Sequence, residues 1–434
     1  MPGTAPGINA QTVSSLAREV IDWRCKGMPS AALGRTVEEF LSARPTLSGA
    51  GFTGPVLVLE ESALEHNLTT MARWCERHGV LLAPHGKTTM APQLFQRQLE
   101  HGAWGITAAN LAQLRVYRAF GVARVLLANQ LLDPDGLRWL GAELDRDPEW
   151  SVSCWADSVA GVRLMARDYP GTRPLDVLVE LGWDGARTGA RTVGQALEVA
   201  REIAASPNLR LAGVAGYEGA AAHGTGDAAL ATVDAYLARM RELVAAVEGA
   251  GLFDGEEIIV SGGGSAYFDQ VAEAIAGPWP TRSRVLPVLR SGAYLTHDDG
   301  LYRRNSPFGR EHRLAGDEGP FRPAMRIWAQ VTSRPEPGLA LVTMGRRDVS
   351  FDQDLPEPRV FRAPGGAVRE FAPGACRVTS LADQHAFLAL DDAEPGVGDW
   401  IGFGLSHPCT VFDKWRLIPV VDGDRVLDLV HTFF

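Results

Sequence analysis

The stretch Val80-Leu81-Leu82-Ala83-Pro84-His85-Gly86-Lys87-Thr88 indicates how the middle of this chain folds. Its first four residues are an apolar run with the length and composition of a buried strand. Pro84 has no N–H group to donate to a neighbouring strand, so we expect the strand to end there. Lys87 then lies in the loop just after the strand. Most lysines in loops are simply solvated, so the importance of Lys87 depends on the pattern that follows it.

Similar apolar runs recur over the next two hundred residues, and amphipathic segments of helical period separate them. This alternation indicates right-handed βαβ units and a parallel sheet, and eight such units predict a (β/α)8 barrel, an α/β fold. The alternative is a doubly wound open sheet, but its glycine fingerprint after the first strand is absent. The strands are expected at Val80–Ala83, Trp104–Thr107, Arg124–Ala128, Ser151–Trp155, Leu175–Glu180, Leu211–Ala215, Glu257–Val260 and Arg284–Leu289. The helices are expected at Pro92–His101, Ala109–Phe120, Pro134–Leu144, Ser158–Asp168, Thr192–Ala205 and Ala228–Glu248.

The loops that follow the strands form the active face of such a barrel. Lys87 is in the first of these loops, and Ser261-Gly262-Gly263-Gly264-Ser265 is in the seventh. Three glycines let backbone N–H groups approach an anion closely, and a helix expected from about Ala266 adds its positive end. A plain tight turn would also explain the glycines, but barrel phosphate sites are common after strands seven and eight. The other loops contribute Asn129, Gln130, Arg187, Thr188, Gly189, Tyr217, Glu218, Arg290, Ser291 and Gly292.

A lysine after strand one and a phosphate cradle after strand seven suggest pyridoxal phosphate, which a lysine binds covalently. Four motifs in this order resemble the D-serine dehydratase / D-threonine aldolase family of fold-type III pyridoxal phosphate enzymes, relatives of the alanine racemase N-terminal domain. The resemblance runs from about Thr53 to Phe434, with one departure, because Lys87-Thr88-Thr89-Met90 replaces the usual Lys-Thr-His-Lys. The motifs are Pro84–Thr88, Arg187-Thr188-Gly189, Tyr217-Glu218-Gly219 and Ser261–Ser265.

The resemblance implies roles for individual residues of the barrel. Lys87 binds the cofactor. From its position in the sequence, His85 either orients the lysine loop or simply packs. Arg187 contacts the cofactor ring, and Tyr217 stacks on the ring or supports it. The cradle of Ser261, Gly262, Gly263, Gly264 and Ser265 binds the phosphate.

The rest of the chain divides into an N-terminal and a C-terminal part. Residues 1–52 are expected to form a helical extension, with two helices between Ala10 and Ala43 and Ser30 as a cap before the second. The barrel is expected at 53–310, and its strand at 53–60 joins the β domain in the resembling family. After a Gly- and Pro-rich junction, 320–434 is expected to be a mostly β domain. Its strands are expected at Met325–Val331, Ala340–Thr343, Arg377–Leu381, Ala386–Leu390, Trp400–Phe403 and Arg416–Val420.

Within the β domain, Ser406-His407-Pro408-Cys409 is a candidate metal site. Residues two apart in extended chain point to the same side, and an imidazole with a thiolate is a zinc-like pair. By itself the pair is more often a packed histidine and a buried thiol. The resembling D-serine dehydratases bind zinc with a His-x-Cys pair here, whereas aldolase relatives tend to have Asp instead of Cys. The same resemblance makes His385 a candidate for the surroundings of the metal.

A second acidic and histidine-containing stretch, His297-Asp298-Asp299-Gly300, is better interpreted as a solvated turn than as a metal site. Five cysteines, an odd and scattered number, do not suggest a disulfide framework, and a reducing cytoplasm is the simplest compartment. The net charge of −10 and the sequence pI near 5.5 argue against nucleic acid or an anionic membrane as a partner. No apolar run is long enough to span a bilayer, and no signal peptide is evident.

These expectations combine into a lyase that requires pyridoxal phosphate and zinc and acts on a D-3-hydroxy amino acid. Lys87 takes the α-proton, the metal on His407 and Cys409 binds the β-hydroxyl, and elimination gives a 2-oxo acid and ammonia. The nearest alternative is retro-aldol cleavage to glycine and an aldehyde. Racemisation would need a second acid/base, usually a tyrosine of the β domain, and no tyrosine follows Tyr302. A non-catalytic pyridoxal phosphate carrier is also disfavoured, because such proteins lack a β domain. Fold-type III relatives imply a homodimer.

Overall fold

The computed structural model describes residues 7–310, 314, 318–390 and 394–434. Eight parallel strands of this part are arranged in the order β2-β9-β8-β7-β6-β5-β4-β3. The two end strands meet where the Thr107 N–H donates to the Pro84 carbonyl at 2.9 Å, beside a bridge between His85 and Thr107. The predicted (β/α)8 barrel is therefore confirmed. The strands are β2 (Leu81–Leu82), β3 (Ile106–Ala108), β4 (Arg124–Gln130), β5 (Ser151–Ala156), β6 (Leu175–Leu181), β7 (Leu209–Gly216), β8 (Glu257–Gly262) and β9 (Arg284–Leu289).

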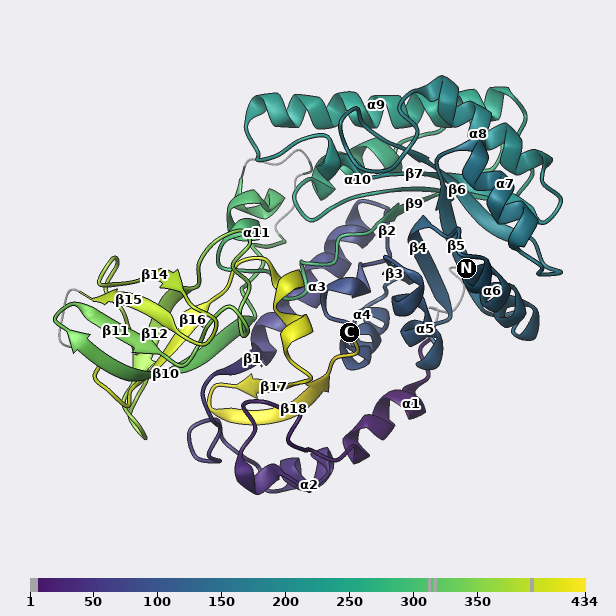
Figure 1. Cartoon of the computed structure of the whole chain (residues 1–434). Helices are drawn as coiled ribbons and strands as arrows, with labels where there is room; N and C mark the ends of the chain where they lie inside the picture. Colours follow the sequence, from purple (N-terminus) through teal and green to yellow (C-terminus); the bar gives the residue numbers. More distant parts are fainter. Residues whose placement is uncertain (1–6, 311–313, 315–317, 391–393) are drawn as a thin grey trace.

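Helices cover the outside of this barrel (Figure 1). Several begin at polar residues whose side chains accept a hydrogen bond from the first turn, such as Asn110, Asp133 and Thr192. The helix after the glycine run begins at Phe268, two residues later than expected. The helices are α3 (Glu61–Arg77), α4 (Pro92–Glu100), α5 (Leu111–Ala119), α6 (Pro134–Arg146), α7 (Val159–Asp168), α8 (Val193–Ala205), α9 (Asp227–Gly249), α10 (Phe268–Ala276) and the short α11 (Leu301–Asn305).

The C-terminal domain is built on a sheet that also includes β1 (Val56–Glu60), although β1 precedes the barrel in the sequence. β1 pairs antiparallel with β10 and parallel with β17. The strand patterns missed β12, β13 and β18. β12 and β18 mix charged with apolar residues, and β13 is only two charged residues long. The strands are β10 (Met325–Glu336), β11 (Leu339–Val342), β12 (Glu357–Arg362), β13 (Arg369–Glu370), β14 (Cys376–Leu381), β15 (Ala386–Leu390), β16 (Trp400–Gly404), β17 (Leu417–Asp422) and β18 (Arg425–His431).

The N-terminal segment contains less helix than the sequence suggested. It has the short helices α1 (Ala10–Ser14) and α2 (Val37–Ser42), and two 3₁₀ turns lie between them. The cap of α2 is Thr36, which forms a capping box with Glu39, so the expectation for Ser30 was wrong. Gly27 and Gly34 have positive φ and Pro29 lies between them, and these residues interrupt any longer helix. The segment packs below β17 and β18 (Figure 1).

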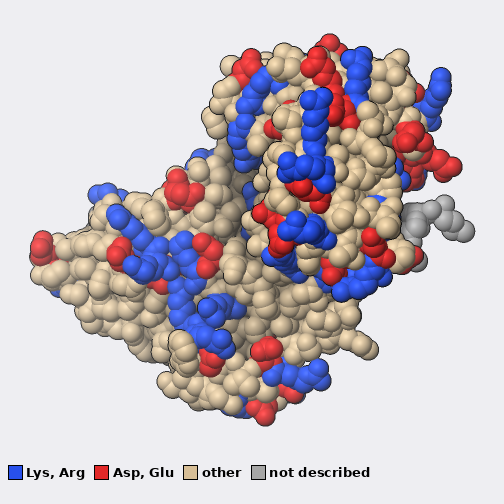
Figure 2. Space-filling view, turned by 45° about the vertical axis from the view of Figure 1, so that its right-hand side comes forward, with Lys and Arg blue, Asp and Glu red and all other residues tan. Residues whose placement is uncertain are grey.

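On the face shown in Figure 2, basic and acidic side chains lie next to one another in several groups, with wide areas without charged side chains between them. Among the described residues, no helix is both long enough and apolar enough to cross a bilayer.

Candidate active site

A cavity of about 590 Å³ lies at the C-terminal ends of the barrel strands, where the β domain faces them. It brings together loops that are far apart in the sequence, from the one after β2 to the one after β16. Most of the cofactor- and metal-binding candidates from the sequence line it, whereas Ser261 and Gly262 lie just behind. The candidates in the lining are His85, Lys87, Arg187, Tyr217, Gly263, Gly264, Ser265, His407 and Cys409.

The loop that presents Lys87 is a short 3₁₀ turn over Gly86–Thr88. Only glycine fits at its first position, because a Cβ on Gly86 would lie 2.5 Å from the Tyr117 hydroxyl oxygen. The turn is also tied to the β domain, since Thr88 Oγ1 and Cys409 Sγ are 3.3 Å apart and hydrogen-bonded. The cofactor-binding candidate and the metal-binding candidate are thus held against each other across one contact.

The glycine loop after β8 has a backbone that favours glycine at Gly263, where φ is +104°. The N–H groups of Gly263 and Gly264 donate to the two carboxylate oxygens of Glu218, at 3.0 and 2.6 Å. A further hydrogen bond joins the loop to the residues just after β9, because Ser291 Oγ donates to the Gly264 carbonyl at 2.8 Å. Two of the N–H groups expected to face an anion in the cavity are therefore engaged by a carboxylate of the protein itself.

Ser261 is part of a buried polar group behind this loop. Its Oγ accepts a hydrogen bond from Arg290 Nη1 at 2.6 Å, and Arg290 Nη2 donates to the Gly216 carbonyl at 2.6 Å. Arg290 is 3% exposed, and burial lowers the pKa of its guanidinium. Arg290 Nε and His85 Nδ1 are enclosed, and neither has a hydrogen-bond partner among the described residues. A positive, glycine-lined cavity with enclosed polar atoms fits a phosphorylated aromatic cofactor such as pyridoxal phosphate.

The opposite wall combines an aromatic ring with a buried carboxylate. The Arg187 guanidinium lies 4.8 Å from the centre of the Tyr217 ring, and burial raises the pKa of Tyr217 to about 12. Glu180, at the end of β6, accepts hydrogen bonds from Gln130 at 2.6 Å and Thr188 at 3.1 Å. Burial raises the pKa of the Glu180 carboxyl. The sequence analysis did not single out Glu180, which lies near the end of a mostly apolar strand.

His407 and Cys409 lie next to each other on the side of the cavity that the β domain supplies. The hydrogen bond with Cys409, followed by that with Asp352, raises the pKa of His407 to about 9. Burial opposes ionisation of the Cys409 thiol, but its bonds with His407 and Thr88 lower the pKa overall. Asp352 Oδ2 bonds His407 Nδ1 at 2.5 Å, which orients the ring.

The donor set of this pair fits a zinc ion with open positions, because an imidazole and a low-pKa thiol are both zinc ligands. The described residues contain no group of three or more histidine, cysteine, aspartate or glutamate side chains that would complete a closed site. Any ion bound by His407 and Cys409 would therefore be accessible to a substrate oxygen.

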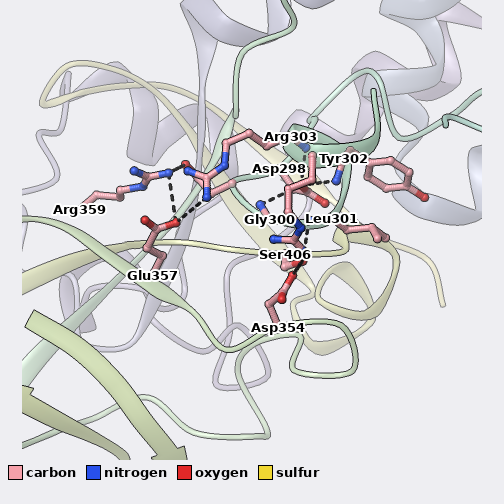
Figure 3. Close-up of polar contacts among 11 residues, drawn as sticks. Asp298, Gly300, Leu301, Tyr302, Arg303, Asp354, Glu357, Arg359 and Ser406 are labelled. Carbon is pink, nitrogen blue, oxygen red and sulfur yellow. Dashed lines mark hydrogen bonds and ion pairs between the residues drawn. The ribbon is translucent and has the colours of Figure 1, made fainter. Parts of the chain in front are cut away.

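The stretch His297-Asp298-Asp299-Gly300 is not a solvated turn, and that expectation was wrong. His297 is 6% exposed and Asp298 is 1% exposed. Asp298 Oδ1 accepts the N–H groups of Gly300 (3.0 Å), Tyr302 (2.8 Å) and Arg303 (3.3 Å), while its Oδ2 accepts the N–H of His407 at 2.9 Å. Figure 3 shows Asp298 beside Gly300, Tyr302 and Arg303, with the Tyr302 ring directed away from the carboxylate. Asp298 thus fixes the start of α11 and the backbone of a metal-ligand candidate at once.

The remaining candidate, His385, is exposed in the turn between β14 and β15 and does not line the cavity. The lining residues that the sequence analysis missed include Tyr302, Asp413 and Phe434. They come from α11 and from the final segment of the β domain, where no local motif distinguishes them. Only the packing of the two domains brings them to the cavity.

Two family models match this chain. Residues 59–274 match the N-terminal domain of alanine racemase, and residues 324–421 match a putative serine dehydratase domain. The 3-hydroxy-D-aspartate aldolase of Paracoccus denitrificans (strain Pd 1222) is 29% identical over 325 residues, 73% of this chain and 78% of the relative. The D-threonine aldolase of an Arthrobacter species is 26% identical over 377 residues, 86% and 90% of the two chains.

Solved structures with the same fold include enzymes of two reaction types. The D-threonine aldolase of Filomicrobium marinum has a TM-score of 0.71 at 24% identity, with 88% of this chain and 95% of that one covered. The D-threo-3-hydroxyaspartate dehydratase of Delftia sp. HT23 has a TM-score of 0.69 at 20% identity, with 90% and 99% covered. Two further structures are variants of a dehydratase of that name. In one, alanine replaces a histidine; in the other, which is in the metal-free form, alanine replaces a cysteine two residues further along the chain. Together these matches show an alanine racemase-type N-terminal domain followed by a serine dehydratase-type domain, and the fold of the chain is that of the fold-type III pyridoxal phosphate enzymes.

Proposed function

We propose that this protein is a pyridoxal phosphate- and zinc-dependent dehydratase that eliminates water from a D-3-hydroxy amino acid. The products are a 2-oxo acid and ammonia. The observation that carries the proposal is the pair His407 and Cys409, which lies on the cavity wall in contact with the Lys87 loop through Thr88. The spacing of the histidine and cysteine replaced in the two dehydratase variants, two residues, supports the same assignment.

The residues of the cavity divide the chemistry between them. When bound, pyridoxal phosphate supplies an electron sink for the α-carbon, and zinc supplies a Lewis acid for the β-oxygen. Lys87 binds the cofactor and, as a free amine, accepts the α-proton of the substrate. His407 and Cys409 bind the zinc ion, and the hydrogen bond from Thr88 keeps the Cys409 thiolate beside the lysine loop. The Arg187 guanidinium and the Tyr217 ring form a wall against which an aromatic cofactor packs.

The competing function is retro-aldol cleavage, which the names of the aldolase relatives favour. The two reactions differ in which bond breaks. Elimination breaks the Cβ–O bond, so a metal that stabilises the departing hydroxide promotes it. Cleavage breaks the Cα–Cβ bond and keeps the β-oxygen, which must lose its proton.

D-Threonine separates the two functions, because its products do not overlap. We expect 2-oxobutanoate and ammonia in equal amounts, loss of turnover on treatment with a chelator, and recovery on addition of zinc. Glycine and acetaldehyde as the main products would establish the aldolase instead. Full activity after removal of the metal would exclude zinc from the reaction.

A matched pair of variants tests the role of the thiolate. Cys409→Asp should weaken zinc binding and depress elimination, because a carboxylate is a harder ligand than a thiolate. Cys25→Ser is the control, since Cys25 is a half-buried thiol of the N-terminal segment that lies outside this cavity. Equal zinc affinity in the two variants would contradict the assignment of Cys409 as a ligand.

A further inference from the structure

The carboxylate of Glu218 lies directly behind the glycine loop. Glu218 is 0% exposed and does not line the cavity, whereas Gly263, Gly264 and Ser265 do. Its two oxygens each accept one N–H group, from Gly263 at 3.0 Å and from Gly264 at 2.6 Å. Consecutive backbone N–H groups in such a turn form a concave anion-binding site, and here the bound anion is a side chain of the protein.

Hydrogen bonds hold the backbone of the two residues that precede Glu218. The Gly216 carbonyl accepts a hydrogen bond from Arg290 Nη2 at 2.6 Å, and the Tyr217 N–H donates to the Tyr236 hydroxyl at 2.9 Å. Tyr236 in turn donates to the Leu181 carbonyl at 2.6 Å. These bonds fix the backbone that carries Glu218, so its carboxylate is presented to the glycine loop.

The next N–H group along the chain has a different environment. Within the part of the chain that the structure describes, the Ser265 N–H donates to no protein acceptor, and Ser265 lines the cavity. Its side chain is also fixed, because Ser265 Oγ accepts the N–H of Ala293 at 3.3 Å. Helix α10 starts three residues later and points its positive end toward the same loop.

We propose that Glu218 is a positioning residue for the phosphate of the cofactor. By taking the Gly263 and Gly264 N–H groups, it fixes the loop so that the Ser265 N–H and the start of α10 face the phosphate. The phosphate is then bound one residue further along the loop than the glycine run alone suggests. Burial raises the pKa of the Glu218 carboxyl, and the two glycine N–H groups and the Arg290 guanidinium oppose that rise. This inference rests on the proposed function insofar as the cofactor is pyridoxal phosphate.

The test compares pyridoxal phosphate with pyridoxal, which lacks the phosphate. Both are titrated against the full-length cofactor-free protein and its variants, and the dissociation constants are read from the visible spectrum. Glu218→Gln replaces one oxygen with an NH₂ group that faces an N–H donor, so the loop must shift. We expect the affinity for pyridoxal phosphate to fall roughly tenfold or more, while that for pyridoxal changes little. The ³¹P resonance of bound cofactor should shift as well.

Two further variants keep the test decisive. Glu218→Asp retains the charge but withdraws the carboxylate by one methylene, so it serves if the Gln variant does not fold, and the same selective loss is expected. Asp348→Asn is the control, because Asp348 is also buried and accepts a backbone N–H, from Gly345 at 3.0 Å, but lies outside the cavity. Asp348→Asn should lower the free energy of unfolding but leave the preference for pyridoxal phosphate over pyridoxal unchanged.

Each outcome separates this inference from the proposed function. Equal losses for the two ligands would overturn the positioning role, since Glu218 would then support the whole site. A rise in pyridoxal phosphate affinity would also overturn it, because it would mean that the phosphate displaces Glu218 from the glycine N–H groups. A wild-type protein that binds neither ligand would instead overturn the cofactor assignment itself.

Discussion

The carboxylate of Asp298 accepts the backbone N–H of His407 at 2.9 Å, although 109 residues separate the two in the sequence. His407 has φ +63°, a left-handed conformation that a histidine rarely adopts. The same carboxylate binds three N–H groups at the start of α11, which carries Tyr302 to the cavity. One buried side chain therefore determines where the metal-ligand candidate lies relative to the barrel.

Replacing Asp298 should uncouple metal binding from cofactor binding. Asp298→Asn leaves one acceptor for four donors, so we expect a loss of about 2–3 kcal/mol in the free energy of unfolding and about tenfold weaker zinc binding. Pyridoxal phosphate should bind as in the wild type. Urea unfolding and competition with a chromogenic chelator measure the two effects. Asp299→Asn is the control, because Asp299 pairs with Arg359 at 2.7 Å and not with His407; equal zinc affinities in the two variants would contradict the prediction.

Lys87 should be the residue that binds the cofactor covalently. We expect Lys87→Ala to remove the visible absorption of bound pyridoxal phosphate and to lower turnover by about 10³-fold or more, because the base is lost with the anchor. Borohydride reduction of the wild type, followed by peptide mapping, identifies the labelled residue. Labelling on a peptide that lacks Lys87 would refute the assignment.

A side chain at Gly263 should weaken cofactor binding as well as lower the stability of the fold. A Cβ there would adopt φ +104° and lie 3.0 Å from Leu289, so Gly263→Ala should destabilise the fold by about 1–3 kcal/mol and weaken pyridoxal phosphate binding. Gly185→Ala is matched to it, with φ +75° but no atom within 4 Å of the added Cβ. The control should be destabilised without a change in cofactor affinity. If Gly263→Ala binds the cofactor normally, the loop does not shape the phosphate site.

Stability should fall with pH below about 6.5 because of the buried His297. Burial lowers the pKa of this histidine to about 4, so the unfolded chain takes up a proton between pH 6.5 and 4 that the folded protein excludes. The free energy of unfolding then rises with pH across this window, by about 1.4 kcal/mol per unit. His297→Asn suits the local φ of +46° and removes the titration, so its loss between pH 6.5 and 5 should be smaller by about 2 kcal/mol. The prediction would be disproved if urea titrations gave the same loss in the free energy of unfolding between pH 6.5 and 5 for both proteins.

The active unit should be a homodimer, as the resemblance to fold-type III enzymes implies. The surface has apolar residues available for association, since Trp23 is 85% exposed and Phe434, on the cavity wall, is 58% exposed. We expect sedimentation velocity to show a dimer at micromolar concentration. Specific activity should fall when dilution produces the monomer. A fully active monomer would rule the dimer out.

Much of the architecture follows from the sequence alone, because a strand and a helix differ in the period of their apolar residues. That period predicted the barrel, and Pro84 placed Lys87 in a loop directly after a strand. These features are local, so neighbouring residues are enough to reveal them. The motif Ser406–Cys409, by contrast, became a candidate metal site only through the resemblance to a known family, because a histidine and a cysteine two residues apart more often simply pack.

The partners of these residues were decided by the tertiary structure. Nothing near Asp298 in the sequence indicates that it binds the N–H of His407, and the acidic stretch around it resembles a solvated turn. Nothing near Glu218 indicates that it fills the glycine loop, and Thr88 meets Cys409 across 321 residues. A buried carboxylate must find donors wherever the packed chain presents them, because leaving it unpaired is costly. Which donors those are depends on how the β domain lies against the barrel, and no local pattern encodes that arrangement.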